Sequence, residues 1–287
     1  MKTGFLGLGA MGRHMARNLH RKGFLAGIWN RSGAPAAELA AELGIPASGT
    51  PAELASTCDV LVLCVSADAD VLSVVDQLLP GLHAGTLVID CSTVSSATAV
   101  EAAKRVGTRG AAFLDCPVTG GTEGARDARL AILCGGDAAD FARGRPVLDA
   151  MGATVTHFGP VGSGQAVKAT NQILCAGYIR TIAEAMAFAR AQGLPLAPLV
   201  ETLGKGAGSS WYFVNRAPFM VNGAYPPGFR VRLHQKDLRI CRDMAARDGV
   251  TLPVVESVLA DYAKLIDEGH GDEDISAVFR LTERLFG

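Results

Sequence analysis

Three features that mark other classes of protein are missing from this 287-residue sequence. No apolar run approaches the ~20 residues that a membrane-spanning helix needs. The formal net charge is only −1, which argues against nucleic acid or an anionic membrane as a partner, because both call for a strongly basic face. From Met1 the chain runs directly into a strand-like pattern, without the apolar stretch and cleavage site of a signal peptide. We therefore expect a cytoplasmic protein.

Paired cysteine motifs are also missing. The seven cysteines are scattered, odd in number, mostly placed inside apolar runs, and none belongs to a C-x-x-C pair. This spacing indicates neither a zinc site nor a disulfide framework. We predict that they are small buried residues of a reduced protein, and we predict no metal site.

A glycine-rich pattern stands near the start of the chain. The apolar pair Phe5-Leu6 runs into G-x-G-x-x-G, and a helical pattern follows at once. In a dinucleotide site the first glycine allows a tight turn, the second lets the backbone approach a pyrophosphate, and the third lets helix and strand pack closely. An empty structural turn would leave the same pattern, but the position between strand and helix favours cofactor binding. The predicted contacts are Gly7, Leu8, Gly9, Ala10, Met11 and Gly12.

The end of the second predicted strand bears on which cofactor is used. Leu25 to Trp29 is followed by Asn30, Arg31 and Ser32. NAD-selecting sites carry an Asp or Glu there, which binds the ribose hydroxyls. An arginine and a serine instead suit a 2′-phosphate. We predict NADP as the cofactor, with NAD possible; the alternative is that Arg31 is only a surface charge.

Continuous apolar runs alternate with helical patterns through the first half of the chain. Such runs are typical of strands covered on both faces, and the alternation predicts an α/β fold. We expect an N-terminal Rossmann-type domain, with a doubly wound, mostly parallel sheet that binds ligands at the carboxyl ends of its strands. After the two strands above, the runs are Val60–Val65, Thr86–Cys91, Ala112–Cys116, Ala131–Cys134 and Ala153–Phe158.

One long helix is predicted over Gly162 to Arg190. At ~1.5 Å per residue it would span roughly 40 Å, longer than most helices inside one domain. We therefore expect an interdomain helix, with boundaries at 1–161 for the dinucleotide-binding domain, 162–191 for the helix and 192–287 for an all-α domain. The apolar residues that recur at helical spacing are Val167, Leu174, Tyr178, Ile182, Met186 and Ala189.

The region after this helix is helical by period. Its predicted breaks lie at Gly204–Gly208, Pro226–Gly228 and Gly269–Gly271, and Lys236-Asp237-Leu238 is expected to open an amphipathic helix. This region is rich in Ala, Val and Leu, and the long helix is longer than is needed to pack against a single neighbouring surface. We therefore predict a homodimer or homotetramer joined through it.

Polar residues gather at three places. Lys168 lies near the start of the long helix, with Asn171 and Gln172 three and four residues on, on one side of the helix. Thr119-Gly120-Gly121 follows a predicted strand, and its backbone N–H groups could cradle a carboxylate. Ser92-Thr93 follows another predicted strand, Thr86–Cys91. Taken alone, the first group could be a solvated lysine with a capping amide, and the others ordinary loops.

These motifs together resemble the β-hydroxyacid dehydrogenase family, which includes 3-hydroxyisobutyrate dehydrogenase and the glyoxylate/succinic semialdehyde and tartronate semialdehyde reductases. The likeness covers nearly the whole length. It rests on the ordered motifs Gly4 to Gly12, Asp90 to Thr93, Asp115 to Gly121, Gly162 to Asn171, and Lys236 to Leu238.

The resemblance implies a role for each matching residue. Lys168 matches the catalytic lysine and Asn171 the amide that orients the substrate. The turn Thr119, Gly120 and Gly121 matches the one that holds the substrate carboxylate. Departures are Gln172, where a second asparagine is common, and Thr119, where serine is common. Positions matching cofactor contacts are Thr93, Lys236, Val65 and Ser66, and positions where substrate pockets differ among members are Trp211 and Phe229.

The implied activity is hydride transfer between NADP(H) and a small β-hydroxy acid or semialdehyde, with Lys168 as general acid and base. Asn30-Arg31-Ser32 looks like the NADPH-using reductases of the family. Rival interpretations are an imine reductase-like enzyme, which generally lacks this lysine, a 6-phosphogluconate dehydrogenase, which has a longer C-terminal domain, and a non-catalytic NADP-binding protein.

Overall fold

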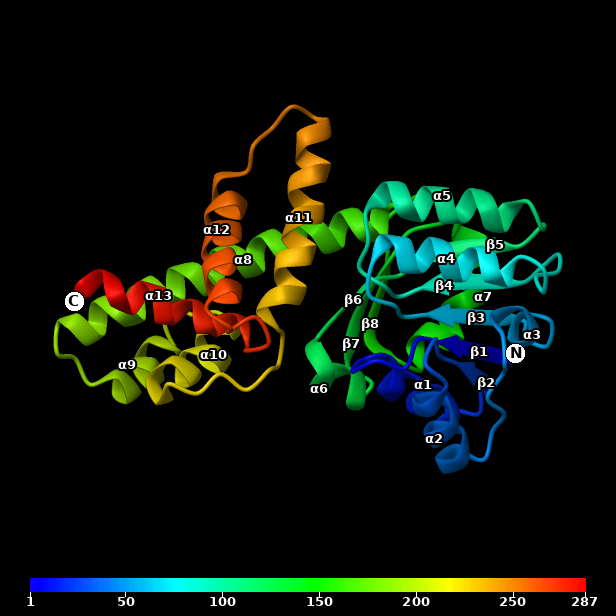
Figure 1. Ribbon diagram of the computed structural model, residues 1–287, viewed down its shortest axis with the longest axis horizontal. Coiled ribbons are helices and arrows are strands. Elements are labelled where there is room, and N and C mark those ends of the chain that lie inside the picture. The colour runs from blue at the N-terminus through cyan, green and yellow to red at the C-terminus, as the bar shows by residue number, and fades with distance from the viewer. The chain divides into compact units, whose positions relative to one another are not determined.

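The computed structural model describes residues 1–287 and divides into two compact units, Met1–Lys168 and Ala169–Gly287. The division falls within one long helix, α8 (Ser163–Ala191), which confirms the single helix predicted there. Figure 1 labels the elements, and each unit is described on its own below. The domain boundaries 1–161, 162–191 and 192–287 stay a prediction.

The first unit alternates strands and helices. Its strands are β1 (Thr3–Leu6), β2 (Leu25–Trp29), β3 (Val60–Leu63), β4 (Leu87–Asp90), β5 (Ala112–Asp115), β6 (Val118–Thr119), β7 (Leu130–Cys134) and β8 (Gly152–His157). Its helices before α8 are α1 (Gly12–Arg21), α2 (Gly33–Leu43), α3 (Pro51–Ala55), α4 (Asp68–Leu78), α5 (Ser96–Gly107), α6 (Gly121–Arg126) and α7 (Ala138–Asp149).

The main sheet has five strands in the order β2-β1-β3-β4-β5, and every neighbouring pair is parallel. Because all five strands run the same way, their carboxyl ends share one edge of the sheet. Ligands of open α/β sheets bind at this edge. The predicted α/β fold with a doubly wound parallel sheet is confirmed.

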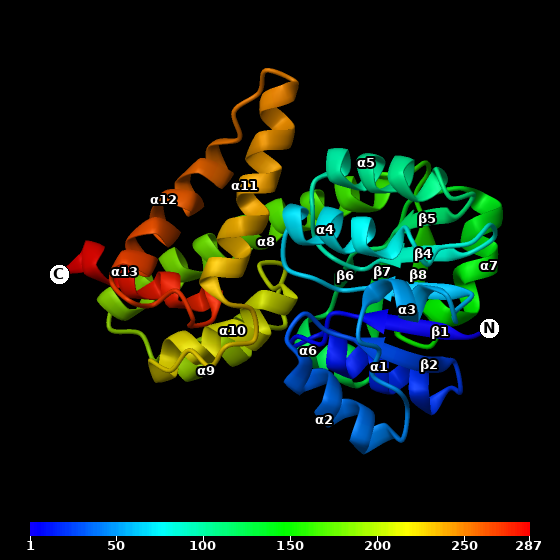
Figure 2. The same ribbon diagram turned by 45° about the vertical axis from the view of Figure 1, so that its right-hand side comes forward.

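Alternate residues of each strand enter different hydrophobic cores. Phe5 and Val62 belong to the core under α1 and α7, whereas Leu6 and Leu63 belong to the core under α3, α4 and α5. Figure 2 shows α4 and α5 side by side over one face of the sheet. Burial on both faces explains why these strands have continuous apolar sequences.

The expectation of one sheet for the whole first unit was wrong. Strands β6, β7 and β8 form a second sheet, in which β6 pairs antiparallel with β7, and β7 pairs parallel with β8. Only an isolated antiparallel bridge, Asp115 to Gly135, connects the end of β5 with the residue after β7. The two-residue strand β6 was not predicted, because two residues carry no readable period.

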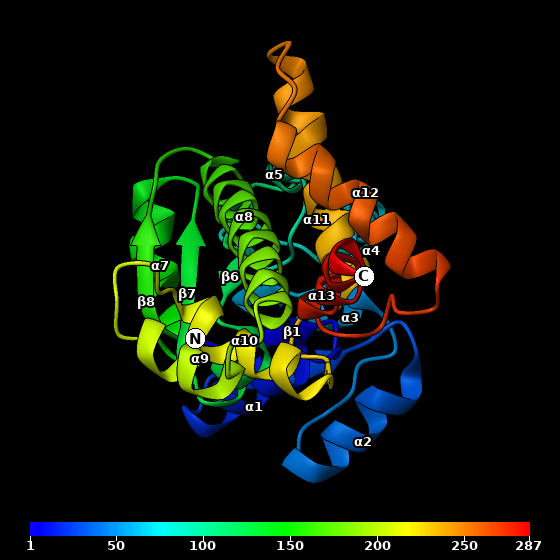
Figure 3. The same ribbon diagram turned by 90° about the vertical axis from the view of Figure 1, so that its left-hand side faces the viewer.

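The second unit is helical, as predicted. Its core includes Tyr262 and Phe279, both fully buried. Helices α11 and α12 form an antiparallel pair, visible in Figures 1 and 3. Besides the remainder of α8, the helices are α9 (Leu196–Leu203), α10 (Trp211–Asn222), α11 (Val231–Arg247), α12 (Pro253–Asp267) and α13 (Phe279–Glu283), with short 3-10 turns at Ile275–Val278 and Arg284–Phe286. None of the helices has the length and hydropathy to cross a membrane.

Two details of the predicted helices need correction. On α8, Leu174 and Tyr178 were placed with the apolar stripe, but 53% and 45% of their surfaces are exposed. The buried stripe of this part of the helix instead includes Ala176 and Ile179. Both stripes have helical period, so the period alone does not tell which one faces the core. The other correction concerns Lys236: α11 begins at Val231, so Lys236 lies inside the helix rather than at its start.

Candidate functional site

The glycine loop between β1 and α1 is shaped for close approach of a ligand. Gly7 has a φ of +97°, and a Cβ atom there would lie 2.2 Å from the carbonyl oxygen of Cys64. A Cβ atom on Gly12 would lie 1.9 Å from the carbonyl oxygen of Gly7. Gly9, in contrast, has nothing within 4 Å of its Cβ position. Two glycines therefore allow the turn and helix packing, while Gly9 opens a surface that fits a pyrophosphate group.

The Asn30 side chain links this loop to the turn after β2. Its Oδ1 accepts a hydrogen bond from the backbone N–H of Leu8 at 2.8 Å. Its Nδ2 donates to the carbonyl oxygen and the hydroxyl of Ser32, at 3.0 Å and 2.9 Å. Both ends of the amide are thus engaged, and Asn30 fixes the turn that presents Arg31 and Ser32.

Arg31 projects from this turn into solvent. Its side chain is 81% exposed, and Nη1 lies 2.7 Å from the carboxylate of Asp70 in the first turn of α4. An exposed pair of this kind is weak, because water and salt screen it. A phosphate group would compete with Asp70 for the guanidinium.

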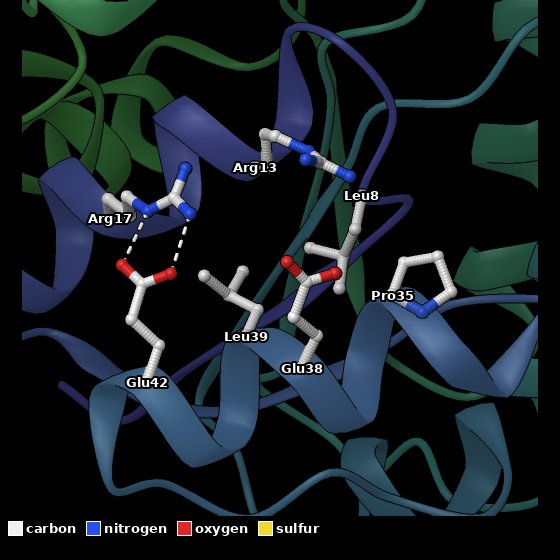
Figure 4. Close-up of a pocket in the computed structure, with 7 residues that line it drawn as sticks. All are labelled: Leu8, Arg13, Arg17, Pro35, Glu38, Leu39 and Glu42. Carbon is white, nitrogen blue, oxygen red and sulfur yellow. Dashed lines mark hydrogen bonds and ion pairs between the residues drawn. The ribbon is translucent and has the colours of Figure 1, made fainter.

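Helices α1 and α2 are joined beside the same loop by Arg17 and Glu42, which form two hydrogen bonds of 2.8 Å and 2.6 Å (Figure 4). The cavity between the helices is about 10 Å³, at the lower limit for a single water molecule. A cavity of this size is too small for a substrate, and the Arg17–Glu42 pair beside it joins the two helices. Its lining residues are Leu8, Arg13, Arg17, Pro35, Glu38, Leu39 and Glu42.

The loop after β4 is held by the first turn of α8. The Gln165 side chain donates to the carbonyl oxygen of Ser92 at 2.8 Å and accepts from the N–H of Val94 at 3.1 Å. These two contacts flank the half-buried Thr93. The hydroxyl of Ser92 in turn accepts from the N–H of Val65 at 2.9 Å. The predicted cofactor contacts Val65 and Thr93 therefore lie in one hydrogen-bonded network, and exposed Ser66 follows Val65.

Asp115, at the carboxyl end of β5, caps the start of α8. It is fully buried, and its two oxygens accept from the N–H groups of Gly162 at 2.7 Å and Gln165 at 2.9 Å. Burial raises the pKa of this carboxyl to about 6, although the hydrogen bonds from backbone N–H groups oppose the rise. A helix N-terminus favours such an acceptor. Asp115 thereby ties the helix that carries Lys168 to the edge of the sheet.

Lys168 is the buried cation of the first unit. Only 7% of its surface is exposed, and Nζ donates to the carbonyl oxygen of Val118 at 2.9 Å. Val118 is followed by Thr119, and then by Gly120 and Gly121, which have φ values of +132° and +67°. The structure therefore brings the lysine together with the Thr-Gly-Gly turn, 47 or more residues away in the sequence.

The second unit contains a chain of four polar side chains. Asn171 Nδ2 donates to Gln172 Oε1 at 2.8 Å, and Gln172 Nε2 donates to Asp237 Oδ2 at 2.7 Å. Asp237 Oδ1 lies 3.0 Å from the ammonium group of Lys236. Asn171 and Lys236, two of the predicted site residues, are thus connected through Gln172 and Asp237.

A group of rings supports this chain. His234 lies on α11, with Nε2 3.2 Å from the carbonyl oxygen of Gln172 and Nδ1 2.9 Å from the hydroxyl of Tyr262. A carbonyl oxygen only accepts, so Nε2 carries a hydrogen, and in the neutral imidazole Nδ1 then accepts from the hydroxyl of Tyr262. The ring of Phe229, another predicted site residue, lies 5.1 Å from the His234 ring. Phe229 therefore packs beside the polar chain.

Trp211 and Phe229 share a common support. The guanidinium of Arg216 lies 5.1 Å from the ring centre of Trp211, and its Nε lies 3.3 Å from the carboxylate of Asp274. Asp274 also accepts from the backbone N–H of Phe229 at 3.0 Å. Arg216 is 8% exposed and Asp274 is fully buried, whereas Trp211 is 61% exposed. One buried ion pair thus contacts both aromatic positions.

Two family models together match nearly the whole chain. Residues 2–159 match the family described as the NAD binding domain of 6-phosphogluconate dehydrogenase. Residues 162–282 match the family described as NAD-binding of NADP-dependent 3-hydroxyisobutyrate dehydrogenase. Glyoxylate/succinic semialdehyde reductase 1 of Arabidopsis thaliana is 32% identical, with 99% of each chain covered. The NAD-dependent L-serine dehydrogenase of Pseudomonas aeruginosa is 34% identical, with 96% of each chain covered.

A solved structure of 3-hydroxyisobutyrate dehydrogenase from Mycobacterium tuberculosis, with L-serine, has a TM-score of 0.90 and 32% identity, and 98% of each chain is covered. The chain belongs to the β-hydroxyacid dehydrogenase family.

As a member of the β-hydroxyacid dehydrogenase family, the protein is an NAD(P)-dependent oxidoreductase with a Rossmann-type domain. Sequence reasoning did not select Gln165, Asp115, Asp237 or Asp70, which hold the predicted site residues in place. Asp115, Gln165 and Asp237 carried a signal, because each lies in one of the motifs that support the resemblance, whereas Asp70 carried none. Among all 287 residues, no group of three or more His, Cys, Asp or Glu side chains is placed to hold a metal ion.

Proposed function

We propose that the protein transfers hydride between NADP(H) and a small β-hydroxy acid or semialdehyde, with Lys168 as the general acid and base. The observation that carries this proposal is the contact of buried Lys168 with Val118, directly before the Thr119-Gly120-Gly121 turn. A buried ammonium group beside a turn with two glycines of positive φ suits a substrate that has a carboxylate and a reacting oxygen.

Lys168 has two tasks in this proposal. In reduction, its ammonium donates a hydrogen bond to the substrate oxygen and then a proton, as negative charge grows there. In oxidation, the neutral amine accepts the proton of the hydroxyl group. General acid and base catalysis of this kind contributes typically ~10²–10⁴-fold to the rate. When bound, the nicotinamide supplies or takes up the hydride.

The other residues position the substrate and cofactor. The turn of Thr119, Gly120 and Gly121 binds the substrate carboxylate, and Asn171, three residues beyond Lys168 on α8, orients the reacting group. Two further groups of residues contact the substrate and the cofactor in this proposal. Trp211 and Phe229 shape the substrate pocket. The cofactor is bound by the loop Gly7, Leu8, Gly9, Ala10, Met11 and Gly12, by Asn30, Arg31 and Ser32, and by Val65, Ser66, Thr93 and Lys236.

A substrate panel with a lysine variant tests the proposed activity. The wild-type protein is assayed by NADPH absorbance with succinic semialdehyde, glyoxylate and tartronate semialdehyde, and in reverse with 3-hydroxyisobutyrate and L-serine. Lys168→Ala should lose about 10²–10⁴-fold in kcat for the best substrate, because it removes the proton donor, and keep NADPH binding, because Lys168 is not among the proposed cofactor contacts. Near wild-type turnover of this variant would contradict the role of Lys168. A wild-type protein that reduces a cyclic imine and none of these acids would contradict the substrate class.

The preference for NADP over NAD is proposed from Arg31, whose guanidinium would pair with the 2′-phosphate. Arg31→Ala should raise the KM for NADPH about tenfold or more and leave the KM for NADH nearly unchanged, because only NADPH carries that phosphate. The measurement is steady-state kinetics with both cofactors. An equal change for both would show that Arg31 does not recognise the phosphate.

We also propose that the protein works in the cytoplasm as a homodimer or homotetramer. Exposed apolar side chains of the second unit, including Leu174 and Tyr178 on α8, support the proposed assembly. Light scattering of the purified protein measures its mass directly. A monomeric mass at micromolar concentration would contradict the proposed assembly.

A further inference from the structure

Two arginines of α1 face α2, and only one of them has a partner. Arg17 is held by Glu42 through two hydrogen bonds of 2.8 Å and 2.6 Å. Arg13, one turn nearer the glycine loop, is half-buried, and its guanidinium forms no hydrogen bond and no ion pair within the chain. Figure 4 shows this side chain directed toward Leu8, with no dashed line to a carboxylate. A half-buried cation without a partner is a candidate to bind an anion.

Arg13 lies beside the turn that follows β2. It lines the small cavity between α1 and α2 together with Leu8 and Pro35. The backbone N–H of Leu8 donates to Asn30 at 2.8 Å, and Pro35 is the third residue of α2, three positions after Ser32. Both neighbours of Arg13 are therefore connected to this turn. A change of side-chain rotamer is enough to bring its guanidinium to an anion bound there.

A 2′-phosphate calls for more positive charge than the turn itself supplies. A phosphate monoester carries about −1.5 to −2 charges at pH 7. Arg31 supplies one positive charge and already lies 2.7 Å from the carboxylate of Asp70. Helix α2, which begins at the turn, contains no lysine or arginine. Since Arg17 is engaged by Glu42, Arg13 is the remaining cation among the residues that line the cavity between α1 and α2.

We propose that Arg13 binds the 2′-phosphate of NADP(H) together with Arg31. The inference rests on the proposed function, in its preference for NADP. It adds a residue of α1 to a phosphate site otherwise made by the turn after β2. Two guanidinium groups from separate elements hold the phosphate from two sides, and each forms charge-assisted hydrogen bonds with its oxygens.

Binding of two nucleotides, measured without turnover, tests the role of Arg13. Calorimetric titration compares 2′,5′-ADP, which carries the 2′-phosphate, with 5′-AMP, which lacks it. Arg13→Gln should weaken binding of 2′,5′-ADP about tenfold and binding of 5′-AMP less than about twofold, because only the first nucleotide loses charge-assisted hydrogen bonds. Arg13→Lys keeps the charge and should recover to within about threefold of the wild type.

Arg109→Gln is the matched control for the loss of one positive charge. Arg109 is exposed and precedes β5, so it lies toward the amino ends of the parallel strands, away from the glycine loop. Salt screens so distant a charge, and neither affinity should change. Thermal melting shows that the variants are folded.

The outcomes separate this inference from the proposed function. Equal affinities of the wild type for 2′,5′-ADP and 5′-AMP would refute the preference for NADP and the role of Arg13 with it. A wild type that prefers 2′,5′-ADP, with a preference that is lost in Arg31→Ala and kept in Arg13→Gln, would overturn the role of Arg13 alone.

The ³¹P signal of bound NADP⁺ reports the contact itself. The signal of the 2′-phosphate follows its second ionisation, which has a pKa of about 6 in phosphate monoesters. A guanidinium beside the phosphate lowers this pKa, because it stabilises the dianion. The pKa of the bound phosphate should therefore be higher in Arg13→Gln than in the wild type, and unchanged in Arg109→Gln. An unchanged value in Arg13→Gln would overturn the inference even if that variant binds 2′,5′-ADP more weakly.

Discussion

Lys168 in the first unit and Asn171 in the second are held by different means. In the first unit, Lys168 donates to a backbone carbonyl, and Asp115 accepts from backbone N–H groups. In the second unit, Asn171 is held by side chains alone, through Gln172 and Asp237. A backbone partner is present whatever the side chains are, whereas a side-chain partner disappears with one substitution.

This difference follows from the architecture. The start of α8 leaves backbone N–H groups available for Asp115, and the short strand β6 leaves the carbonyl oxygen of Val118 available for Lys168. Within a helix most backbone groups are bonded internally, so side chains make most of the contacts between helices. A substitution in the second unit should therefore disturb its neighbours more than a comparable one in the first. The Arg–Asp pairs of the two units differ in burial: Arg31–Asp70 in the first unit is exposed, and Arg216–Asp274 in the second is buried.

The largest expected effect is at the buried pair of the second unit. Arg216→Met should lower the free energy of unfolding by about 3–5 kcal/mol, because it leaves the fully buried carboxylate of Asp274 without its cation. Urea denaturation followed by tryptophan fluorescence measures the change. As a matched control, Arg230→Met removes an exposed pair with Asp272 and should change stability little. Equal losses in the two variants would remove the contrast between buried and exposed pairs.

The backbone-held carboxylate of the first unit should give a smaller, pH-dependent effect. Burial raises the pKa of Asp115 from 3.8 to about 6. The folded state therefore binds this proton more tightly than the unfolded chain, and the resulting stability is complete below about pH 4 and lost as pH rises through about 6. At ~1.36 kcal/mol per pKa unit, this contribution is roughly 3 kcal/mol.

Urea denaturation of wild type and Asp115→Asn between pH 4 and 7.5 measures this contribution. The stability difference, wild type minus variant, should fall as pH rises to about 6.5 and then stay level, because asparagine does not titrate. A difference that is constant over the whole range would show that backbone donors hold Asp115 ionised throughout, and would strengthen the case for backbone support in this unit.

The smallest expected effect is at the exposed pair of the first unit. Asp70→Asn removes a carboxylate that competes for Arg31 and repels a phosphate, so binding of 2′,5′-ADP should tighten about two- to fivefold. Binding of 5′-AMP, which lacks the 2′-phosphate, should not change. Calorimetric titration measures both. If both nucleotides respond alike, Asp70 acts on the fold of the turn rather than on phosphate recognition.

Much of the fold could be predicted because its signals are local. Continuous apolar runs marked the buried strands, and G-x-G-x-x-G marked the loop between β1 and α1. The burial of Leu174 and Tyr178 was predicted wrongly, because two stripes of α8 have the same period and only the packing of other helices selects one. The second sheet was missed because its strand β6 spans two residues.

The sequence by itself determined most of the strands and helices, the glycine loop and the motifs that indicate the family, because each depends on residues close together in the chain. The tertiary structure alone decided that Lys168 contacts Val118, that Asp115 caps α8, and that Gln172 joins Asn171 to Asp237. Except for the bond between the neighbours Asn171 and Gln172, these contacts join residues that are 47 to 65 positions apart in the sequence. The periodicity of a sequence does not predict contacts between residues so far apart, because the partner of a buried polar group depends on how the whole chain folds.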